Sequence, residues 1–264
     1  MAFHEDVKAR GVLIVVEGLD RAGKTVQCQL LLEALQQRGH HVKYIKFPGN
    51  TTMKVCLGWV LKHACSDRNS LTGKIINGYL QGQAQQDDHS IHLLFSANRW
   101  EAAQRIRSDL SNGITIIVDR YSYSGAVYSA AKENPDLSLE WAWQPEVGLP
   151  RPDLLLFLSI SAEETAKRGG YGEERYETNA MQSKVRHLFD RLLSMNHGHD
   201  IHLIDARFPV DQVAKDILNS TLGHLSERKP LETFAKLRSW QELTEATSQE
   251  SVNSKTGSAQ RITY

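Results

Sequence analysis

The stretch GVLIVVEGLDRAGKT, residues 11–25, decides the fold of this chain. Its apolar run Val12–Val16 predicts a short buried strand, and residues 18–25 then match the pattern G-x-x-x-x-G-K-[ST] in full. The glycines let backbone N–H groups turn toward phosphate oxygens, and the helix expected to follow adds partial positive charge at its start. A strand, this loop and a helix in succession therefore predict a nucleotide site.

Side chains in and near the loop fit the chemistry of phosphate transfer. Lys24 is expected to reach the β and γ phosphates, and the Thr25 hydroxyl is expected to bind Mg²⁺. Asp119 follows the predicted strand Ile114–Val118, at the sheet edge where an acid joins the Mg²⁺ shell. Arg120 comes next and can bind a phosphate through two nitrogens. The loop alone leaves many ATPases and kinases open.

The rest of the chain alternates short apolar runs with helical periodicity, which predicts an α/β fold with a parallel sheet covered on both faces. The expected strands are Val12–Val16, Val42–Phe47, Ile114–Val118, Leu154–Leu158 and His202–Ile204. The expected helices are Val26–Arg38, His89–Leu110, Tyr123–Lys132, Ala162–Arg168, Ala180–Met195 and Val210–Leu222.

Composition narrows the class of protein. The 31 basic residues balance 31 acidic ones, so bulk charge indicates neither a nucleic-acid partner nor a membrane surface. Three cysteines without metal-type spacing indicate a reducing compartment. The N-terminus reads as neither a secretory signal nor a good presequence, and no window approaches ~18 apolar residues. We therefore expect a cytoplasmic enzyme, with nuclear or mitochondrial pools left open.

The C-terminal part differs in character from the rest. From about Gln241 it is rich in Ser and Thr and poor in core-forming residues. Such a segment buries too little apolar surface to offset the entropy of ordering, which predicts disorder. We expect a single domain over residues 1–230, followed by a polar and largely disordered extension over residues 231–264.

Five stretches together resemble thymidylate kinase, a nucleoside-monophosphate kinase that phosphorylates dTMP. They are GVLIVVEGLDRAGKT, DDHSIHLLFSANRWE, GITIIVDRYSYSGAVYSAAKEN, VGLPRPDLLLFL and AKRGGYGEERYE. They keep the family's order, and the pairing of LLFSANRWE with DRY-x-x-SG is highly specific. The resemblance implies the P-loop nucleoside-monophosphate kinase fold, with five parallel strands, flanking helices and a mobile lid over about residues 158–182. It also implies a homodimer that uses ATP and Mg²⁺.

The resemblance assigns roles on the acceptor side. Phe95 would stack on thymine, Arg99 would hydrogen-bond the base edge, and Tyr128 would crowd a 2′-hydroxyl. The implied dTMP-binding residues are Asp20, Arg68, Phe95, Arg99, Arg120, Tyr128 and Tyr176.

On the donor side, Arg21 lies inside the loop, where it would reach the transferring phosphoryl group as in the eukaryote-like members, and Arg168 would stack on adenine. The implied ATP-binding residues are Gly18, Arg21, Ala22, Gly23, Lys24, Thr25, Val26 and Arg168. The implied catalytic residues are Asp20, Arg21, Lys24 and Arg120, with Thr25 and Asp119 as metal ligands.

One segment departs from the family pattern. Phe47-Pro48 is followed by no arginine, whereas Asp67-Arg68-Asn69-Ser70 matches the expected continuation. Residues 49–66 therefore align as an insertion, and Arg68 takes the phosphate-binding role. Six apolar side chains in the insertion have the spacing of an amphipathic helix: Met53, Cys56, Leu57, Val60, Leu61 and Ala64.

The insertion leaves two readings beside an active dTMP kinase. The first is a nucleotide-binding protein of the same fold whose activity is impaired, because Arg68 has lost a rigid mount and a ~1 Å displacement can cost ~10²-fold in rate. The second is a kinase for another nucleotide or deoxynucleotide.

Overall fold

The computed structural model describes residues 9–48, 71–132, 134–166, 176, 178–195, 200–226 and 235–257. The expected insertion at 49–66, Arg68 and Arg168 lie outside the described residues. None of the helices in the described part combines the length and apolar character that a membrane crossing requires.

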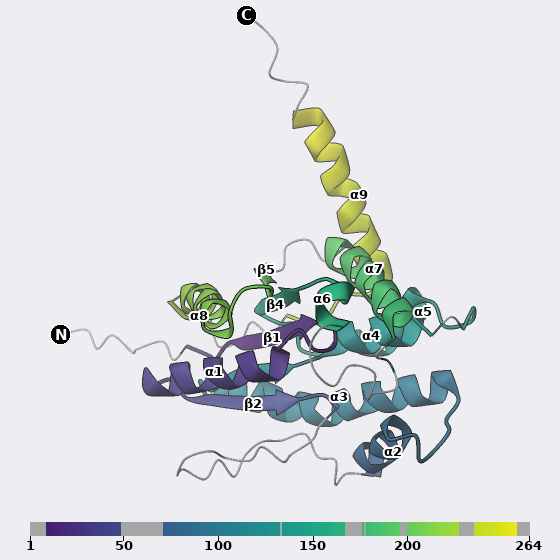
Figure 1. The fold of residues 1–264 in the computed structure, drawn as a ribbon. Coiled ribbons are helices and arrows are strands. Elements are labelled where there is room, and N and C mark those ends of the chain that lie inside the picture. Colours follow the sequence, from purple (N-terminus) through teal and green to yellow (C-terminus); the bar gives the residue numbers. More distant parts are fainter. Residues whose placement is uncertain are drawn as a thin grey trace, which may run out of the picture.

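The core of the molecule is a five-stranded parallel sheet with the strand order β2-β3-β1-β4-β5 (Figure 1). The strands are β1 (Leu13–Gly18), β2 (Val42–Lys46), β3 (Thr115–Asp119), β4 (Leu154–Ser159) and β5 (Asp200–Asp205). The predicted α/β fold and all five predicted strands are confirmed. Because β1 pairs with β3 on one side and β4 on the other, the loop after β1 emerges at the switch point of the sheet, where parallel sheets bind ligands.

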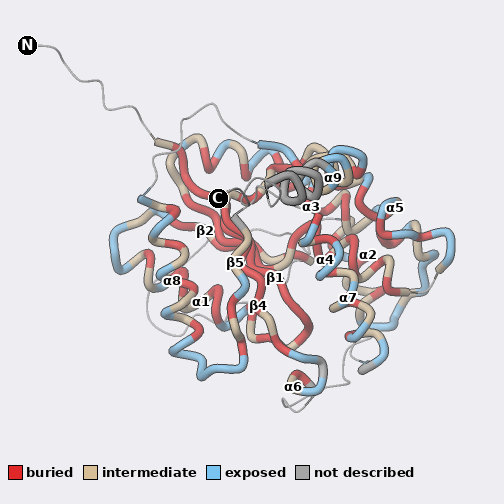
Figure 2. Tube along the Cα trace, turned by 90° about the horizontal axis from the view of Figure 1, so that it is seen from above, coloured by how far each residue is buried: buried red, intermediate tan, exposed pale blue. Residues whose placement is uncertain are grey.

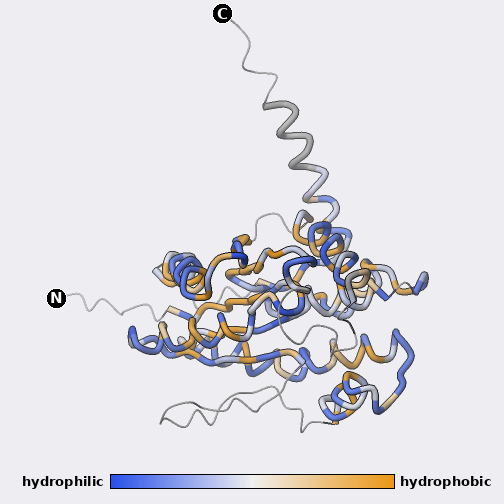
Figure 3. Tube along the Cα trace, viewed as in Figure 1, coloured by the Kyte–Doolittle hydropathy of each residue, from blue (hydrophilic) through white to orange (hydrophobic). Residues whose placement is uncertain are grey.

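Alternation of side chains along the strands builds two apolar layers. On β1, Leu13 and Val15 face one layer while Ile14 and Val16 face the other. Buried residues follow the strands through the middle of the molecule, and hydrophobic stretches follow the same path (Figures 2 and 3). Both faces of the sheet are therefore covered, as the continuous apolar runs predict.

Helices supply the other half of each layer. One face is covered by α1 (Lys24–Gln37) and α8 (Val210–Ser226), and the opposite face by α3 (Asp88–Ser111), α4 (Ser122–Ala130), α5 (Leu139–Trp143) and α7 (Asn179–Met195). The remaining helical elements are α2 (Leu71–Leu80), which packs on α3, the 3₁₀ turn η1 (Gln144–Glu146), α6 (Ala162–Ala166) and α9 (Trp240–Gly257).

Local signals explain where α3 begins and ends. The Asp87 carboxylate caps its start by accepting hydrogen bonds from the N–H groups of His89 and Ser90, and Gly113 follows its end with φ 78°. The six predicted helices are present, whereas α2, α5 and α9 were not predicted. The predicted helix Ala162–Arg168 corresponds to α6, and its last two residues lie outside the described residues.

The structure corrects the predicted disorder of the C-terminal extension over residues 235–257. These residues run along the body of the molecule and then form α9, which projects away from it (Figure 1). Leu237, Trp240 and Leu243 are buried in the same core as α7, and Arg191 lies 5.6 Å from the ring centre of Trp240. Buried apolar side chains and backbone hydrogen bonds thus fasten a segment whose average composition is polar.

Truncating Leu243, whose side chain is fully buried, tests this packing. Leu243→Ala is expected to lower the free energy of unfolding by roughly 2–5 kcal/mol, because it removes apolar contacts and leaves a cavity. Urea unfolding followed by circular dichroism measures the change.

The matched control is Glu245→Ala on the exposed side of the same helix, which should stay within about 0.5 kcal/mol of the parent. Equal unfolding curves for the two variants would mean that α9 contributes nothing to the core.

Candidate active site

The loop between β1 and α1 wraps around the ammonium group of Lys24. Gly18 and Gly23 have φ values of 143° and 94°, which residues with a β-carbon rarely adopt. A β-carbon at Gly18 would also lie 2.7 Å from the carbonyl oxygen of Leu158. The buried Lys24 donates hydrogen bonds to the carbonyl oxygens of Gly18, at 3.0 Å, and Leu19. The predicted strand–loop–helix arrangement is therefore present.

Lys24 holds its proton less firmly than an ordinary lysine. Burial, followed by the nearby positive charge of Arg120, lowers its pKa to about 8, although Asp20 and Asp119 oppose the shift. An incoming anion would restore the charged form.

Thr25 and Asp119 meet at the carboxyl ends of β1 and β3. The Thr25 hydroxyl donates to Asp119 Oδ2 at 2.6 Å, and Tyr44 donates to the same oxygen at 3.1 Å. Lys46 lies 3.6 Å from that oxygen. Asp119 Oδ1 is buried and has no hydrogen-bond partner within the described part of the chain. The Thr25 hydroxyl and the Asp119 carboxylate, with its unsatisfied Oδ1, fit the oxygen ligands that Mg²⁺ requires.

Glu17, on β1, fixes the turn that carries Arg120. Its buried carboxylate accepts hydrogen bonds from the backbone N–H of Tyr121 at 2.8 Å and of Ser124 at 3.1 Å, and from the Ser124 hydroxyl. Burial raises the pKa of Glu17, and these donors oppose the rise. Arg120 itself has φ 66°, a left-handed conformation that a non-glycine residue adopts only when its surroundings hold it.

Arg120 pairs with Asp20, so the start of α4 is tied directly to the phosphate loop. Gln182 of α7 donates to Asp20 Oδ2 at 2.8 Å and to the carbonyl oxygen of Tyr176 at 2.9 Å. Burial raises the pKa of Asp20, but the positive charges of Arg120 and Lys24 outweigh it and leave the pKa below its usual value. Asp20 is thus held as a carboxylate.

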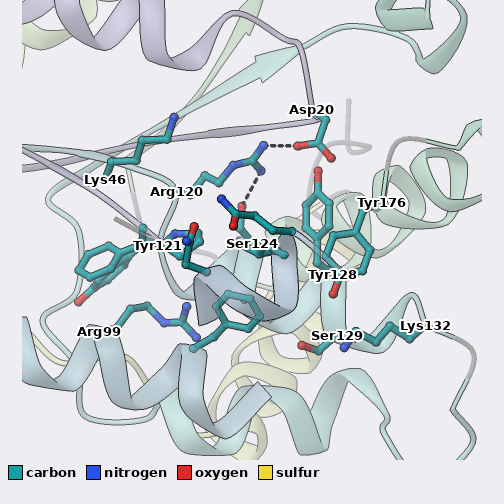
Figure 4. Close-up of a pocket in the computed structure, with 17 residues that line it drawn as sticks. Asp20, Lys46, Arg99, Arg120, Tyr121, Ser124, Tyr128, Ser129, Lys132 and Tyr176 are labelled. Atoms are coloured by element: carbon teal, nitrogen blue, oxygen red, sulfur yellow. Dashed lines mark hydrogen bonds and ion pairs between the residues drawn. The ribbon is translucent and has the colours of Figure 1, made fainter. Parts of the chain in front are cut away.

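Next to the phosphate loop lies a cavity of about 500 Å³ (Figure 4). Asp20 and Arg120 lie at one end, and Arg99 of α3 lies at the other. The cavity brings together every predicted dTMP-binding residue in the described part of the chain: Asp20, Phe95, Arg99, Arg120, Tyr128 and Tyr176.

Hydrogen bonds link Tyr176 and Lys132, which line the cavity, to Tyr79 behind it. The Tyr176 hydroxyl donates to the Tyr79 hydroxyl of α2 at 3.0 Å, and Lys132 donates to the same Tyr79 oxygen at 3.1 Å. Tyr176 is the described residue of the expected lid that reaches the cavity, and it stacks edge-on with Tyr128 at 6.0 Å. Tyr176 and α2 therefore meet at one side of the cavity.

Sequence reasoning missed Glu17, Gln182, Lys46 and Lys132. The partners of Glu17, and Asp20 as the partner of Gln182, lie more than 100 positions away in the chain, and no local pattern marks either residue. Lys46 alone carried a signal, because it ends β2 at the same sheet edge as the phosphate loop.

A phosphate loop that opens beside a cavity lined by arginines and aromatic rings defines a nucleotide kinase of the P-loop class. The model of the thymidylate kinase family matches residues 16–217. The chain belongs to the thymidylate kinase family, as its resemblance predicted.

Individual relatives agree with this assignment. The chain is 42% identical to the thymidylate kinase of Danio rerio over 224 residues, which cover 84% of this chain and 96% of the relative. It is 41% identical to that of Homo sapiens over the same shares. The solved structure of the Candida albicans thymidylate kinase superposes with a TM-score of 0.67 at 38% identity, covering 82% of this chain and 95% of that one.

The lowered pKa of Lys24 predicts a pH dependence for ATP binding. Lys24 is charged below about pH 8 and loses its proton above it, so the phosphates lose a cationic partner as the pH rises. We expect the dissociation constant for ATP to rise roughly tenfold between pH 7 and pH 9. Calorimetric titration measures the constant, and repeating it in buffers of different ionisation enthalpy should reveal proton uptake near pH 8.

Circular dichroism at pH 9 controls for unfolding of the protein. An unchanged dissociation constant and no proton uptake over this range would contradict the predicted titration of Lys24.

Proposed function

We propose that the chain transfers the γ-phosphoryl group of ATP to dTMP, giving dTDP and ADP in the synthesis of dTTP. One observation carries the proposal: in a member of the thymidylate kinase family, six acceptor-side residues line one cavity beside the phosphate loop. A substrate bound there would have its phosphate near Arg120 and its base near Phe95 and Arg99.

The residues that line the cavity would each contact a different part of dTMP. Phe95 stacks on the thymine ring and Arg99 donates hydrogen bonds to the base edge. Tyr128 lies against the deoxyribose, and Asp20 accepts from the 3′-hydroxyl. Arg120 binds the acceptor phosphate, and Arg68, outside the described residues, shares that role. Tyr176 covers the nucleotide from the lid side.

On the donor side, the backbone of the phosphate loop and Lys24 hold the ATP phosphates. Thr25 and Asp119 are the residues that would hold Mg²⁺, whose charge neutralises phosphate oxygens when it is bound. The loop contributes Gly18, Arg21, Ala22, Gly23, Lys24, Thr25 and Val26, and Arg168, outside the described residues, covers the adenine.

The protein's work in this reaction is positioning and charge neutralisation. The acceptor phosphate is already an anionic nucleophile, so no strong general base is needed. Arg120, Arg21 and Lys24 bring two like-charged phosphates into line and stabilise the charge that moves between them. Asp20 orients both Arg120 and the acceptor sugar, which makes it the link between the two substrates.

We also infer that the enzyme is a homodimer with a mobile lid and that it works in a reducing compartment. A homodimer is supported by apolar side chains exposed on α2 and α3, at Leu71, Ile75, Leu93 and Trp100. The lid spans about residues 158–182, and the catalytic domain spans residues 1–230 with residues 231–264 as its extension. A reducing, cytoplasmic compartment is supported by the cysteine pattern.

The alternatives have less support. A same-fold protein with impaired activity would need a disturbed acceptor cavity, yet the described acceptor residues share one cavity with intact ion pairs. A kinase for another nucleotide would not account for the family relationship over residues 16–217.

A coupled ADP-release assay with dTMP, dUMP, AMP and thymidine tests the function. We expect the highest kcat/KM with dTMP and turnover near background with AMP and thymidine. A preference for another acceptor would overturn the proposal.

The same assay on a chain lacking residues 49–66 tests the insertion. Equal turnover of dTMP by the full chain and the deletion variant would reject the hypothesis that the insertion impairs activity. Activity confined to the deletion variant would establish that hypothesis.

Arg21→Gly tests the catalytic use of the loop arginine. We expect kcat to fall ~10³-fold or more, the scale of an arginine that stabilises charge only in the transition state, while the KM for ATP changes far less. Steady-state kinetics separates the two constants. Near-normal turnover would remove Arg21 from the catalytic group.

A further inference from the structure

Arg99 is held by a partner that does not line the cavity. Its Nε and Nη2 atoms donate to the two carboxylate oxygens of Glu146 at 2.7 and 2.6 Å, in a two-bond pair. The side chains are 4% and 0% exposed, respectively. Arg99 lines the acceptor cavity, whereas Glu146 lies behind it. Glu146 therefore acts on a ligand only through the guanidinium.

Glu146 sits on a backbone that is itself fastened to α3. The carbonyl oxygen of Pro145, its neighbour in η1, accepts from the Ser96 hydroxyl at 3.0 Å and from Trp100 Nε1 at 2.7 Å. Ser96, Arg99 and Trp100 have i, i+3 and i+4 spacing, so one face of α3 holds η1. The direction of the carboxylate is therefore fixed relative to the helix that carries Arg99.

The C-terminal extension braces η1 from the other side. Leu237 exchanges backbone hydrogen bonds with Gly148 and Leu149, at 3.1 and 2.9 Å. Trp143 Nε1, just before η1, donates to the carbonyl oxygen of Arg238 at 2.9 Å. Glu146 is thus enclosed between α3 and the extension.

Gly125 of α4 leaves the space that the guanidinium occupies. A β-carbon at this position would lie 2.4 Å from Arg99 Nη2 and 2.9 Å from Nη1. No side chain is compatible with those distances unless Arg99 shifts. The same helix places Tyr128 in the cavity, so a shift of Arg99 away from Gly125 would change its position relative to the other acceptor residues.

These contacts leave one set of donors for a ligand. The pair with Glu146 uses Nε and one N–H of Nη2, so the second N–H of Nη2 and the two of Nη1 remain and keep a fixed direction. The carboxylate also offsets the guanidinium charge, which suits recognition of a neutral carbonyl better than of a second phosphate. Thymine presents such a carbonyl at O4, where cytosine presents an amino donor.

We propose that Glu146 is a positioning residue that aims Arg99 at the base carbonyl, and that Gly125 is the specificity-determining gap which admits the guanidinium. This inference rests on the acceptor role proposed for Arg99. Together the two residues set the preference for a base with a carbonyl at this position over one with an amino group.

Glu146→Gln tests the aiming role, with dTMP and dCMP as acceptors. We expect the KM for dTMP to rise on the order of tenfold and the ratio of kcat/KM for dTMP over dCMP to fall, because the guanidinium loses its charged partner. The KM for ATP and the kcat at saturating dTMP should stay within about twofold. Glu146→Asp, which keeps the charge, should fall between this variant and the parent.

Asp153→Asn is the matched structural control. Arg10 and Asp153 form a similar two-bond pair, at 2.7 and 2.6 Å with exposures of 5% and 11%, and neither residue lines the cavity. Both this variant and Glu146→Gln are expected to lose thermal stability, but the acceptor ratio of Asp153→Asn should stay at the parent value. If the two variants shift the ratio equally, or neither shifts it, Glu146 has no positioning role.

Gly125→Ala tests the gap, because its β-carbon displaces Arg99. Alanine favours a helix over glycine by roughly 1 kcal/mol, which offsets part of the cost of that displacement, and circular dichroism checks that the variant is folded. We expect a raised KM for dTMP and a lowered acceptor ratio. Gly223→Ala on α8 is the control, because its β-carbon would meet no atom within 4 Å. A normal acceptor ratio in Gly125→Ala would overturn the assigned role of Gly125.

Arg99→Met separates this inference from the proposed function on which it rests. A large loss of dTMP affinity in Arg99→Met, with none in Glu146→Gln, would reject Glu146 and keep Arg99. No loss in Arg99→Met would instead reject the base-recognition role of Arg99 itself.

Discussion

A single buried carboxylate, that of Glu17, holds the two halves of the site together. It lies on the strand that leads into the phosphate loop, and it accepts both backbone and side-chain hydrogen bonds from the first turn of α4. Burying a carboxylate is costly unless its oxygens are satisfied, so the structure is stable only when α4 starts at this position. The left-handed turn at Arg120 follows from that constraint. The same constraint sets the distance between the phosphate loop and the first turn of α4.

Two arginines at opposite ends of the cavity show how charge is arranged before any substrate arrives. Arg120 pairs with Asp20 beside the phosphate loop, and Arg99 pairs with Glu146 at the far end. Each pair orients a fork of N–H donors, which lowers the ordering that a nucleotide must impose when it binds. The Arg120 pair is partly exposed, whereas the Arg99 pair is buried and reaches the cavity only through the guanidinium.

Local sequence signals were sufficient for the strands, the phosphate loop and most helices, because each depends on residues close together in the chain. They were also sufficient for Asp119 and Arg120, whose position after an apolar run places them at the sheet edge. They were not sufficient for Glu17, Gln182 or Glu146, since a buried polar residue acquires its role from partners 47 to 162 positions away. The extension was mispredicted for a related reason: average composition concealed the few apolar residues, Leu237, Trp240 and Leu243, that fix it.

The path of the extension has a consequence for the order in which the enzyme is completed. Residues 235–243 brace η1, yet they are synthesised after every other described part of the cavity. The sheet, the phosphate loop and the cavity-lining residues up to Tyr176 therefore leave the ribosome before the segment that braces η1. The brace on η1 is thus the last of these parts that synthesis can complete.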